Sequence, residues 1–233
     1  MPVRAELKSL PLELAEQVGA HLAAAGELIA TDPALALRHA RAARRRAARL
    51  TVTREALGEA AYAAGDWSAA LNEFRALRRM TGDQVWLPVM ADCERALGRP
   101  QAALRLVRES ARLDMRPQDR VELRLVEAGA RDDLGQRAEA LRLLRRTLAS
   151  LPQRAVAGRV RVGYALADLL LADGHTDEAA RQFADVAARD TDGATDAAER
   201  SDALAGLVLE IGDDEHDEDD EDDEPAHDEE NDA

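Results

Sequence analysis

The chain has 233 residues, of which 46% are hydrophobic and only 3% aromatic, a balance that supports a folded core but argues against a β-rich fold. Its net charge of −15 comes from residues 213–233, which hold 15 Asp and Glu and no Lys or Arg, so that residues 1–212 carry 31 acids and 31 bases. The single cysteine, Cys93, excludes an intramolecular disulfide.

The start of the chain, MPVRAELKSLPLELAEQ, carries scattered charges and lacks the apolar stretch of a signal peptide. The longest apolar run, from Tyr164 to Ala172, is interrupted by Asp168 and is far shorter than the ~20 residues of a membrane span. We therefore expect a soluble cytoplasmic protein that does not bind a membrane.

A pattern of a turn followed by a helix recurs from Asp32 onward. Its first copy has Asp32-Pro33 in the turn, followed by Ala36, and the next four copies open on a glycine. An alanine stands five residues after each glycine, and a large apolar residue stands four residues after that alanine. The glycines are Gly65, Gly98, Gly135 and Gly174, the alanines are Ala70, Ala103, Ala140 and Ala179, and the large residues are Phe74, Val107, Leu144 and Phe183. Counted from Ala36, successive alanines are 34, 33, 37 and 39 residues apart.

Each position of this pattern has a physical role in a pair of packed helices. The glycine ends the first helix in a left-handed conformation that costs other residues more. The small alanine lets the second helix approach closely, and the large residue fills the gap between pairs. A period in the thirties with helical patterning predicts an all-α, right-handed solenoid of about five helix pairs. Prolines are expected at helix starts, at Pro33, Pro100, Pro117 and Pro152, with Pro88 inside the first turn of a helix that begins near Trp86.

The last segment before the acidic end, Thr195 to Gly212, predicts one more helix. Its apolar residues share one face, as expected of a capping helix that covers the last pair. These residues are Ala203, Leu204, Leu207, Val208 and Ile211. The expected domains are therefore a helical repeat domain over residues 1–212 and a disordered acidic tail over residues 213–233, because a run of like charge cannot bury apolar surface.

The repeat resembles the tetratricopeptide repeat (TPR) family, and the best copy runs from Thr51 to Gly82. There Leu57, Gly58, Ala70 and Phe74 match the small and large positions of the motif, and Trp67 takes the aromatic turn position. Later copies replace Gly58 by another small residue, at Ala91, Ala128 and Ala167, and replace the usual aromatic of the first helix by Ala61, Glu94, Arg131 and Leu170. The resemblance spans residues 12–192, and the acidic tail makes the chain similar to uncharacterised actinobacterial TPR proteins.

The resemblance implies that one face of each first helix lines a concave groove. The residues expected there are Glu55, Glu59, Tyr62, Asp92, Arg95, Leu125, Asp132, Arg161, Tyr164 and Asp168. Acids outnumber bases, and the Lys, Arg and Asn clamp that some family members use for a terminal carboxylate is missing. A basic or arginine-containing protein segment is the better electrostatic match. The alternative is that these are ordinary solvated helix charges.

A basic stretch, residues 33–54, carries seven arginines and no acid. At ~100° per residue, one face holds alanines and Leu50, and the opposite face holds Arg38, Arg41, Arg45 and Arg49. This patch predicts either a phosphate-rich partner such as RNA or the ribosome, or an acidic protein surface. No aromatic residue is interleaved for base stacking, so sequence-specific nucleic-acid binding is not expected. A solvated arginine face explains the same stretch, and the acidic tail either solubilises the chain or folds back on this patch as an electrostatic gate.

The sequence contains no complete metal-binding or catalytic motif. Around Gly193, the segment RDTDGATDAAE places Asp190, Asp192, Asp196 and Glu199 at calcium-loop positions, but Ala188 stands where the loop needs its first carboxylate. The histidines are scattered, and Cys93 falls inside a helix as a packed thiol. We expect no metal, no cofactor and no enzymatic activity. The sequence therefore predicts a non-catalytic scaffold that binds a protein segment, with an RNA- or ribosome-associated factor as the alternative.

Overall fold

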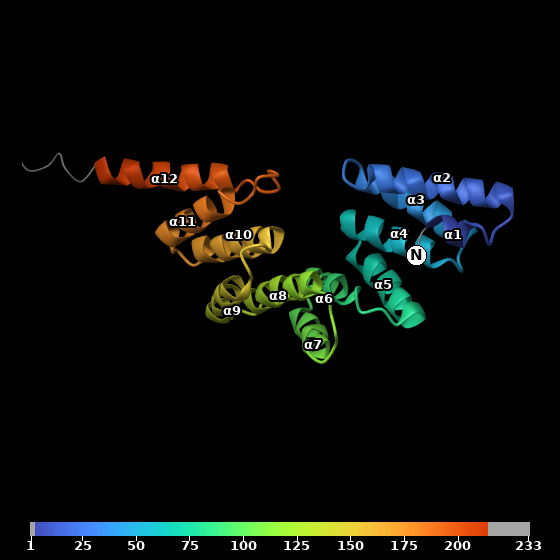
Figure 1. Ribbon diagram of the computed structural model, residues 1–233, viewed down its shortest axis with the longest axis horizontal. Coiled ribbons are helices and arrows are strands. Elements are labelled where there is room, and N and C mark those ends of the chain that lie inside the picture. Colours follow the sequence, from blue (N-terminus) through green and yellow to red (C-terminus); the bar gives the residue numbers. More distant parts are fainter. Residues whose placement is uncertain (1–2, 214–233) are drawn as a thin grey trace, which may run out of the picture.

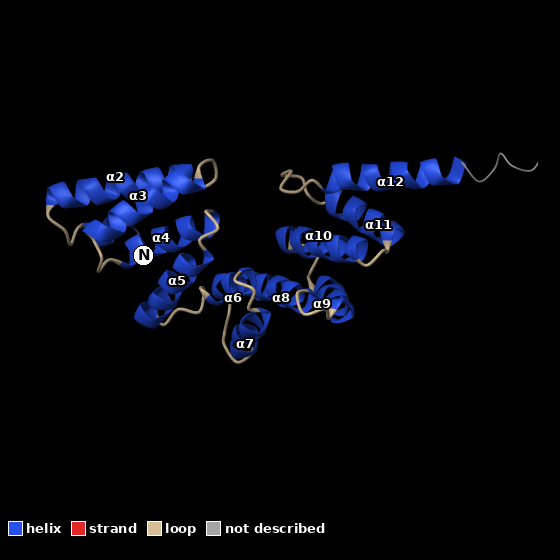
Figure 2. Ribbon diagram, turned by 180° about the vertical axis from the view of Figure 1, so that it is seen from behind, coloured by secondary structure: helices blue, strands red, loops and turns tan. Residues whose placement is uncertain are grey.

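The computed structural model describes residues 3–213, which form helices and connecting turns without a β-strand. Five helix pairs follow one another along the chain, and Figures 1 and 2 show them stacked into a curved array. This confirms the predicted all-α solenoid of five pairs. The helices are α1 (Val3–Leu7), α2 (Leu12–Leu28), α3 (Pro33–Arg46), α4 (Thr51–Ala63), α5 (Trp67–Thr81), α6 (Leu87–Ala96), α7 (Pro100–Ser110), α8 (Pro117–Asp132), α9 (Arg137–Ser150), α10 (Val156–Ala172), α11 (Thr176–Ala187) and α12 (Ala197–Asp213).

The pairs are α2 with α3, α4 with α5, α6 with α7, α8 with α9, and α10 with α11, and α12 packs on α11. We call the first helix of each pair the inner helix and the second the outer helix. The inner helices α6, α8 and α10 contact one another in sequence, whereas the outer helices α5, α7 and α9 lie along the convex edge in Figure 1. The predicted acidic tail lies outside the described residues, apart from Asp213 at the end of α12.

The four glycine turns have one shared geometry. Gly65, Gly98, Gly135 and Gly174 adopt φ values of 75°, 71°, 73° and 81°, as the pattern predicted. In each turn, the residue after the glycine donates its backbone N–H to a carbonyl five positions earlier, as Asp66 does to Ala61 at 2.8 Å. This bond closes the end of the inner helix, and the left-handed residue that permits it is unfavourable for any side chain.

The small and large positions of the repeat form the core. Ala70, Ala103, Ala140 and Ala179 are fully buried, and Phe74, Val107, Leu144 and Phe183 are at most 8% exposed. The buried residues divide into four clusters along the solenoid instead of one central core. This is the arrangement expected when each pair packs only against its neighbours.

Two local expectations were wrong. Pro152 does not start a helix, because the chain first makes a turn in which Ala155 donates to the Pro152 carbonyl, and α10 begins only at Val156. The sequence also predicted one continuous helical face of small apolar residues from Ala36 to Leu50, but α3 ends at Arg46. The buried Thr53 hydroxyl donates to the carbonyls of Ala47 and Leu50 and holds the turn that separates α3 from α4.

Charge is segregated between the two layers of helices. The inner helices α2, α4, α6, α8 and α10 carry twelve acids and seven arginines. The outer helices α3, α5, α7, α9 and α11 carry fifteen arginines and six acids. The near-neutral body that the sequence indicated therefore has an acidic inner layer and a basic outer layer.

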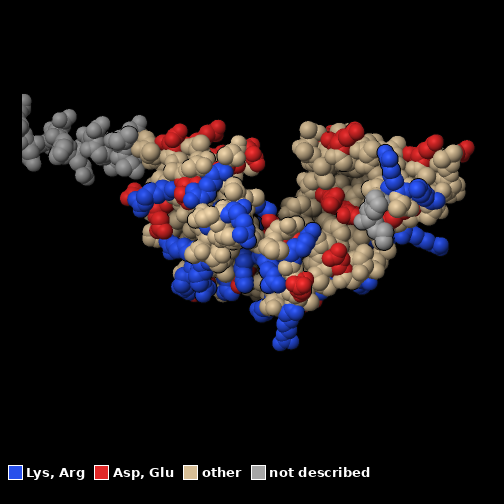
Figure 3. Space-filling model, viewed as in Figure 1, with Lys and Arg blue, Asp and Glu red and all other residues tan. Residues whose placement is uncertain are grey.

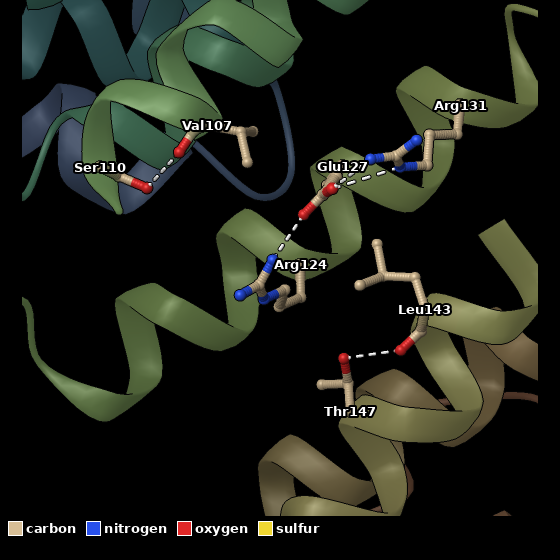
Figure 4. Close-up of polar contacts among 7 residues, drawn as sticks. All are labelled: Val107, Ser110, Arg124, Glu127, Arg131, Leu143 and Thr147. Carbon is tan, nitrogen blue, oxygen red and sulfur yellow. Dashed lines mark hydrogen bonds and ion pairs between the residues drawn. The ribbon is translucent and has the colours of Figure 1, made fainter. Parts of the chain in front are cut away.

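Some inner acids are structural. Glu127 of α8 is 7% exposed and accepts hydrogen bonds from Arg124 at 2.7 Å and from Arg131 at 2.8 Å (Figure 4). Glu94 of α6 is 4% exposed and pairs with Arg75. A buried carboxylate needs such partners, because leaving it unpaired costs several kcal/mol, of the order of 3 to 5. These two acids are therefore engaged within the fold.

Among the described helices, none has the length and apolar character needed to cross a bilayer.

Candidate functional site

A concave groove of about 640 Å³ lies between the inner helices α6, α8 and α10. Figure 3 shows the hollow between the two arms of the molecule above this region. Six of the ten residues predicted for the groove line it, from four different helices. They are Tyr62, Asp92, Arg95, Leu125, Arg161 and Asp168.

The floor of the groove is apolar. Val85, Pro88 and Val89 line it at the start of α6, and Ala165 and Leu169 line it from α10. Leu125 and Val126 complete the floor from α8. An apolar floor with a few polar groups at its margin is the usual composition of a binding groove.

Asp92 organises the polar wall on α6. The Tyr62 hydroxyl donates to one oxygen of Asp92 at 2.5 Å, and Arg95 Nε donates to the other at 3.2 Å. Burial and the hydrogen bond to Asp92 raise the pKa of the Tyr62 hydroxyl well above its usual range. Burial alone would lower the pKa of Arg95, but Asp92 and Asp133 outweigh it and raise the pKa. Tyr62 therefore stays a hydrogen-bond donor and Arg95 stays charged.

Arg95 reaches across the next inner helix, and Gly129 makes room for it. A Cβ at Gly129 would lie 3.3 Å from Cδ and Nε of Arg95, closer than most real contacts. Gly129 itself lines the groove, so the absence of a side chain there lets a guanidinium lie over α8. The position of Arg95 is thus fixed by Asp92, Asp133 and the lack of a side chain on α8.

Glu122 is a groove residue that the sequence reasoning missed. It lies on α8 one turn before Leu125, and it forms an ion pair with Arg161 of α10. Burial raises the pKa of the Glu122 carboxyl, and Arg161 only partly offsets that rise. The helical period could have revealed Glu122, because residues three apart lie on the same face. The pairing with Arg161 could not be read from the sequence, since it joins residues 39 positions apart.

Two predicted residues belong to helix contacts instead. Tyr164 donates its hydroxyl to Asp196 at 2.6 Å and accepts a hydrogen bond from Arg200 of α12 at 2.8 Å. Arg200 also pairs with Asp168 and stands 4.2 Å from the centre of the Phe183 ring. Asp132 pairs with Arg137 at 2.7 Å at the turn between α8 and α9, away from the groove. These contacts join neighbouring helices.

Glu55 and Glu59 line a second, smaller hollow of about 290 Å³ between α2 and α4. Partial removal from water raises the pKa of both carboxyls, and the Glu55 charge raises the pKa of Glu59 further. Within residues 3–213 neither carboxylate takes part in an ion pair. They extend the acidic character of the inner layer beyond the main groove.

Comparison with solved structures places this arrangement among known folds. The protein TTC0263 from Thermus thermophilus, described as a thermophilic TPR protein, aligns with a TM-score of 0.62 and 20% identity over 82% of this chain and 99% of its own. The chain has the fold of a TPR solenoid. The TPR domain of P58(IPK) aligns with a TM-score of 0.40 and 16% identity over 86% of this chain and 58% of its own. No protein-family model matches the sequence, and no curated protein matches it.

On the TPR solenoid, the predicted basic patch is less continuous than expected. Arg38, Arg41 and Arg45 are exposed on α3, but Arg41 pairs with Asp66 at 2.8 Å. Arg49 is exposed in the turn that follows α3. Only Arg38 and Arg45 are thus helical members of the patch that take part in no ion pair within the described part of the chain.

Other candidate residues of the TPR solenoid have structural roles. The Asp190 carboxylate accepts hydrogen bonds from the backbone of Ala194 and Thr195 and from the Thr195 hydroxyl, so it closes the turn before α12. These bonds lower the pKa of Asp190. Cys93 is fully buried, and burial raises the pKa of its thiol to about 12. Among the side chains of residues 3–206, no cluster of three or more His, Cys, Asp or Glu could hold a metal ion.

Proposed function

We propose that the protein is a non-catalytic scaffold whose concave groove binds a segment of a partner protein that combines basic and apolar side chains. The observation that carries this proposal is the apolar floor between α6, α8 and α10 with carboxylates at its margin. Apolar residues of the partner would cover Val89, Leu125 and Leu169. Its basic residues would meet the acids on the groove wall.

The charge balance of the groove favours a basic partner. Four acids line it, Asp92, Asp119, Glu122 and Asp168, against two arginines. Each of these acids already has an arginine partner, so a basic segment would share the carboxylates with the arginines that hold them. The pairs are Asp92 with Arg95, Asp119 with Arg116, Glu122 with Arg161 and Asp168 with Arg200. Complementary charge across an interface increases specificity and the rate of association.

Glu122 is the acid best placed to respond to such a partner. Its raised pKa shows that the Arg161 charge does not fully offset the burial of the carboxylate. A second guanidinium or ammonium from the partner would supply the missing compensation. The binding energy would then come from apolar contact with the floor and from this added ion pair.

The alternative, an RNA- or ribosome-associated factor that docks on Arg38, Arg41, Arg45 and Arg49 and is gated by the acidic tail, has weaker support at those residues. Arg41 is engaged by Asp66, and Arg49 lies outside α3. The groove, by contrast, joins residues from separate helices into one continuous surface. We therefore prefer the groove as the primary binding site.

The test compares three forms of the full chain as affinity baits in a cell lysate at moderate salt. They are the wild type, Asp92→Asn/Glu122→Gln, and the control Glu13→Gln/Glu16→Gln, which removes two exposed acids from α2. Proteins held by the wild type and the control but not by the groove variant support the proposal. Equal retention by all three baits would overturn it.

A defined probe gives a second measurement. A fluorescent nonapeptide of alternating Leu and Arg should bind the wild type and the control with equal affinity, and bind the groove variant at least tenfold more weakly. The same peptide with Glu in place of Arg should not bind. Equal affinity for the two peptides would show that groove charge does not select the partner.

A further inference from the structure

The outer helices carry arginines at helical spacing, on the side of the solenoid opposite the groove. Arg75, Arg78 and Arg79 follow one face of α5, and Arg105 and Arg108 follow one face of α7. On α9 the same spacing recurs at Arg142, Arg145 and Arg146. Figure 1 places these three helices along the convex edge, and Figure 3 shows Lys and Arg side chains gathered there.

This positive charge is only partly compensated. Each of the three acids on the outer helices α3, α5, α7 and α9 is engaged, Glu73 with Arg54, Glu109 with Arg78, and Glu139 with Arg142. A set of exposed arginines remains that takes part in no ion pair with a side chain of residues 3–206. They are Arg79 on α5, Arg105 and Arg108 on α7, Arg112 in the turn after α7 and Arg146 on α9, and we call them the outer arginine surface.

A hollow of about 460 Å³ lies beside this surface, between α5, α6 and α7. Arg75, Arg78 and Arg79 line it, and Met90 and Leu106 form its apolar part. Arg75 and Arg78 are held by Glu94 and Glu109, so Arg79 is the cation of this hollow that takes part in no ion pair within residues 3–206. Guanidinium groups bind phosphate oxygens through paired hydrogen bonds, which makes arginine the usual residue for this contact.

We propose that the outer arginine surface binds the phosphate backbone of a single-stranded nucleic acid. Phosphates repeat regularly along a strand, as the arginines repeat along α5, α7 and α9. The surface is convex, and a flexible single strand can follow it. A duplex bends little over such a distance, since its persistence length is about 150 base pairs, so it would touch fewer arginines at once.

The contact would not depend on base sequence. The chain has six aromatic residues, and none of them is exposed. They pack in pairs within the fold, as Tyr62 does with Trp67 and Phe74 with Trp86. No aromatic residue lines the hollow beside the outer arginine surface, so binding would come from phosphate contacts and would weaken with salt.

The test is fluorescence anisotropy with a labelled 20-nucleotide oligouridine and the full chain, over a series of salt concentrations. The variant is Arg79→Gln/Arg105→Gln/Arg108→Gln/Arg112→Gln. The control removes four exposed cations elsewhere, as Arg4→Gln/Lys8→Gln/Arg154→Gln/Arg181→Gln. Circular dichroism and thermal melting establish that both variants are folded.

We expect the full chain to bind the oligouridine at 50 mM salt and the variant to bind at least tenfold more weakly, with the control within twofold of the wild type. The logarithmic salt slope should fall by about 0.7 for each phosphate that the variant no longer binds. A duplex of the same length should bind more weakly than the single strand.

Three outcomes would overturn the proposal. They are no saturable binding of oligouridine by the full chain at 50 mM salt, equal weakening in variant and control, or a duplex that binds as tightly as the single strand. A synthetic peptide of residues 213–233 provides a further arm. If that peptide binds the wild type but not the variant, while oligouridine does not bind, the surface takes an acidic polypeptide instead.

Discussion

The ring of Phe74 on α5 lies directly against Gly58 on α4, so close that a Cβ at Gly58 would be 2.9 Å from Cε1 of the ring. Phe74 is 1% exposed and cannot move aside without disturbing the cluster around it. Gly58→Ala should therefore lower the free energy of unfolding by about 1 to 3 kcal/mol, the usual cost of overpacking. Urea denaturation followed by circular dichroism measures this change.

A matched substitution should have the opposite effect. Gly26 lies within α2, and no atom comes within 4 Å of a Cβ placed on it. Gly26→Ala should stabilise the protein by about 0.5 to 1 kcal/mol through helix propensity. If both substitutions changed stability in the same direction, the contact between Gly58 and Phe74 would not explain the first result.

The pair His21 and His39 should make stability sensitive to mild acid. Their Nδ1 atoms are 3.0 Å apart, so one ring donates to the other only while the acceptor is unprotonated. Burial, followed by Arg46, His39 and Arg45, lowers the pKa of His21 below 6.5. The unfolded chain then binds more protons than the folded chain, so this contribution is present above pH 6.5 and is lost as pH falls through the folded pKa.

Thermal melting between pH 5 and pH 8 measures this dependence. His21→Gln should flatten the melting temperature between pH 6.5 and pH 5 relative to the wild type. His175→Gln serves as the control, because His175 is an exposed residue at the start of α11. An unchanged pH profile in His21→Gln would contradict the assignment.

Binding of the basic nonapeptide should strengthen as pH rises from 4.5 towards 7. The pKa of Glu122 lies above 4.5 because of burial, so part of this range neutralises the carboxylate. A cationic ligand favours the ionised form, and its affinity therefore rises as the proton leaves. Isothermal titration calorimetry in two buffers should show proton release on binding at the acidic end of this range. In Glu122→Gln both the release and much of the pH dependence should vanish.

Arg200 should hold α12 on the last pair. It hydrogen-bonds Tyr164, pairs with Asp168 and lies over the Phe183 ring. Arg200→Ala should speed amide hydrogen exchange in α12 and lower the free energy of unfolding by about 1 to 3 kcal/mol, because a charged hydrogen-bond donor is removed. Arg181→Ala, at an exposed position of α11, should leave both quantities near the wild type. Equal exchange in both variants would contradict the role of Arg200.

The solenoid could be predicted from the sequence, because its repeat period is set by residues close together in the chain. Gly65 and Ala70 mark a turn and a close contact that recur three times, and each copy has the backbone and burial that those residue types favour. Pro152 was misplaced because proline fits the start of a turn as well as the start of a helix. The end of α3 was missed because the buried Thr53, which closes the turn, bonds to Ala47, six residues earlier.

The groove was less predictable, because its residues depend on contacts between repeats. Asp132 and Tyr164 have the right residue types, but Arg137 and Arg200 bind them. Arg200 lies 36 residues after Tyr164, on a helix outside the repeat, and periodicity gives no information about such a pairing. The helical period could have predicted Glu122 as a groove residue, since it lies one turn before Leu125.

The division of the core into four clusters has a mechanical consequence. Elements coupled only to their neighbours behave as springs in series, so their compliances add and the ends of the molecule move more than any single interface does. The middle pair has the shortest of the paired helices, α6 and α7, with 10 and 11 residues. A small change in the angle between α6 and α8 therefore alters the width of the groove and the curvature of the opposite side together. A ligand that changes the curvature at one surface would thus change the geometry of the other.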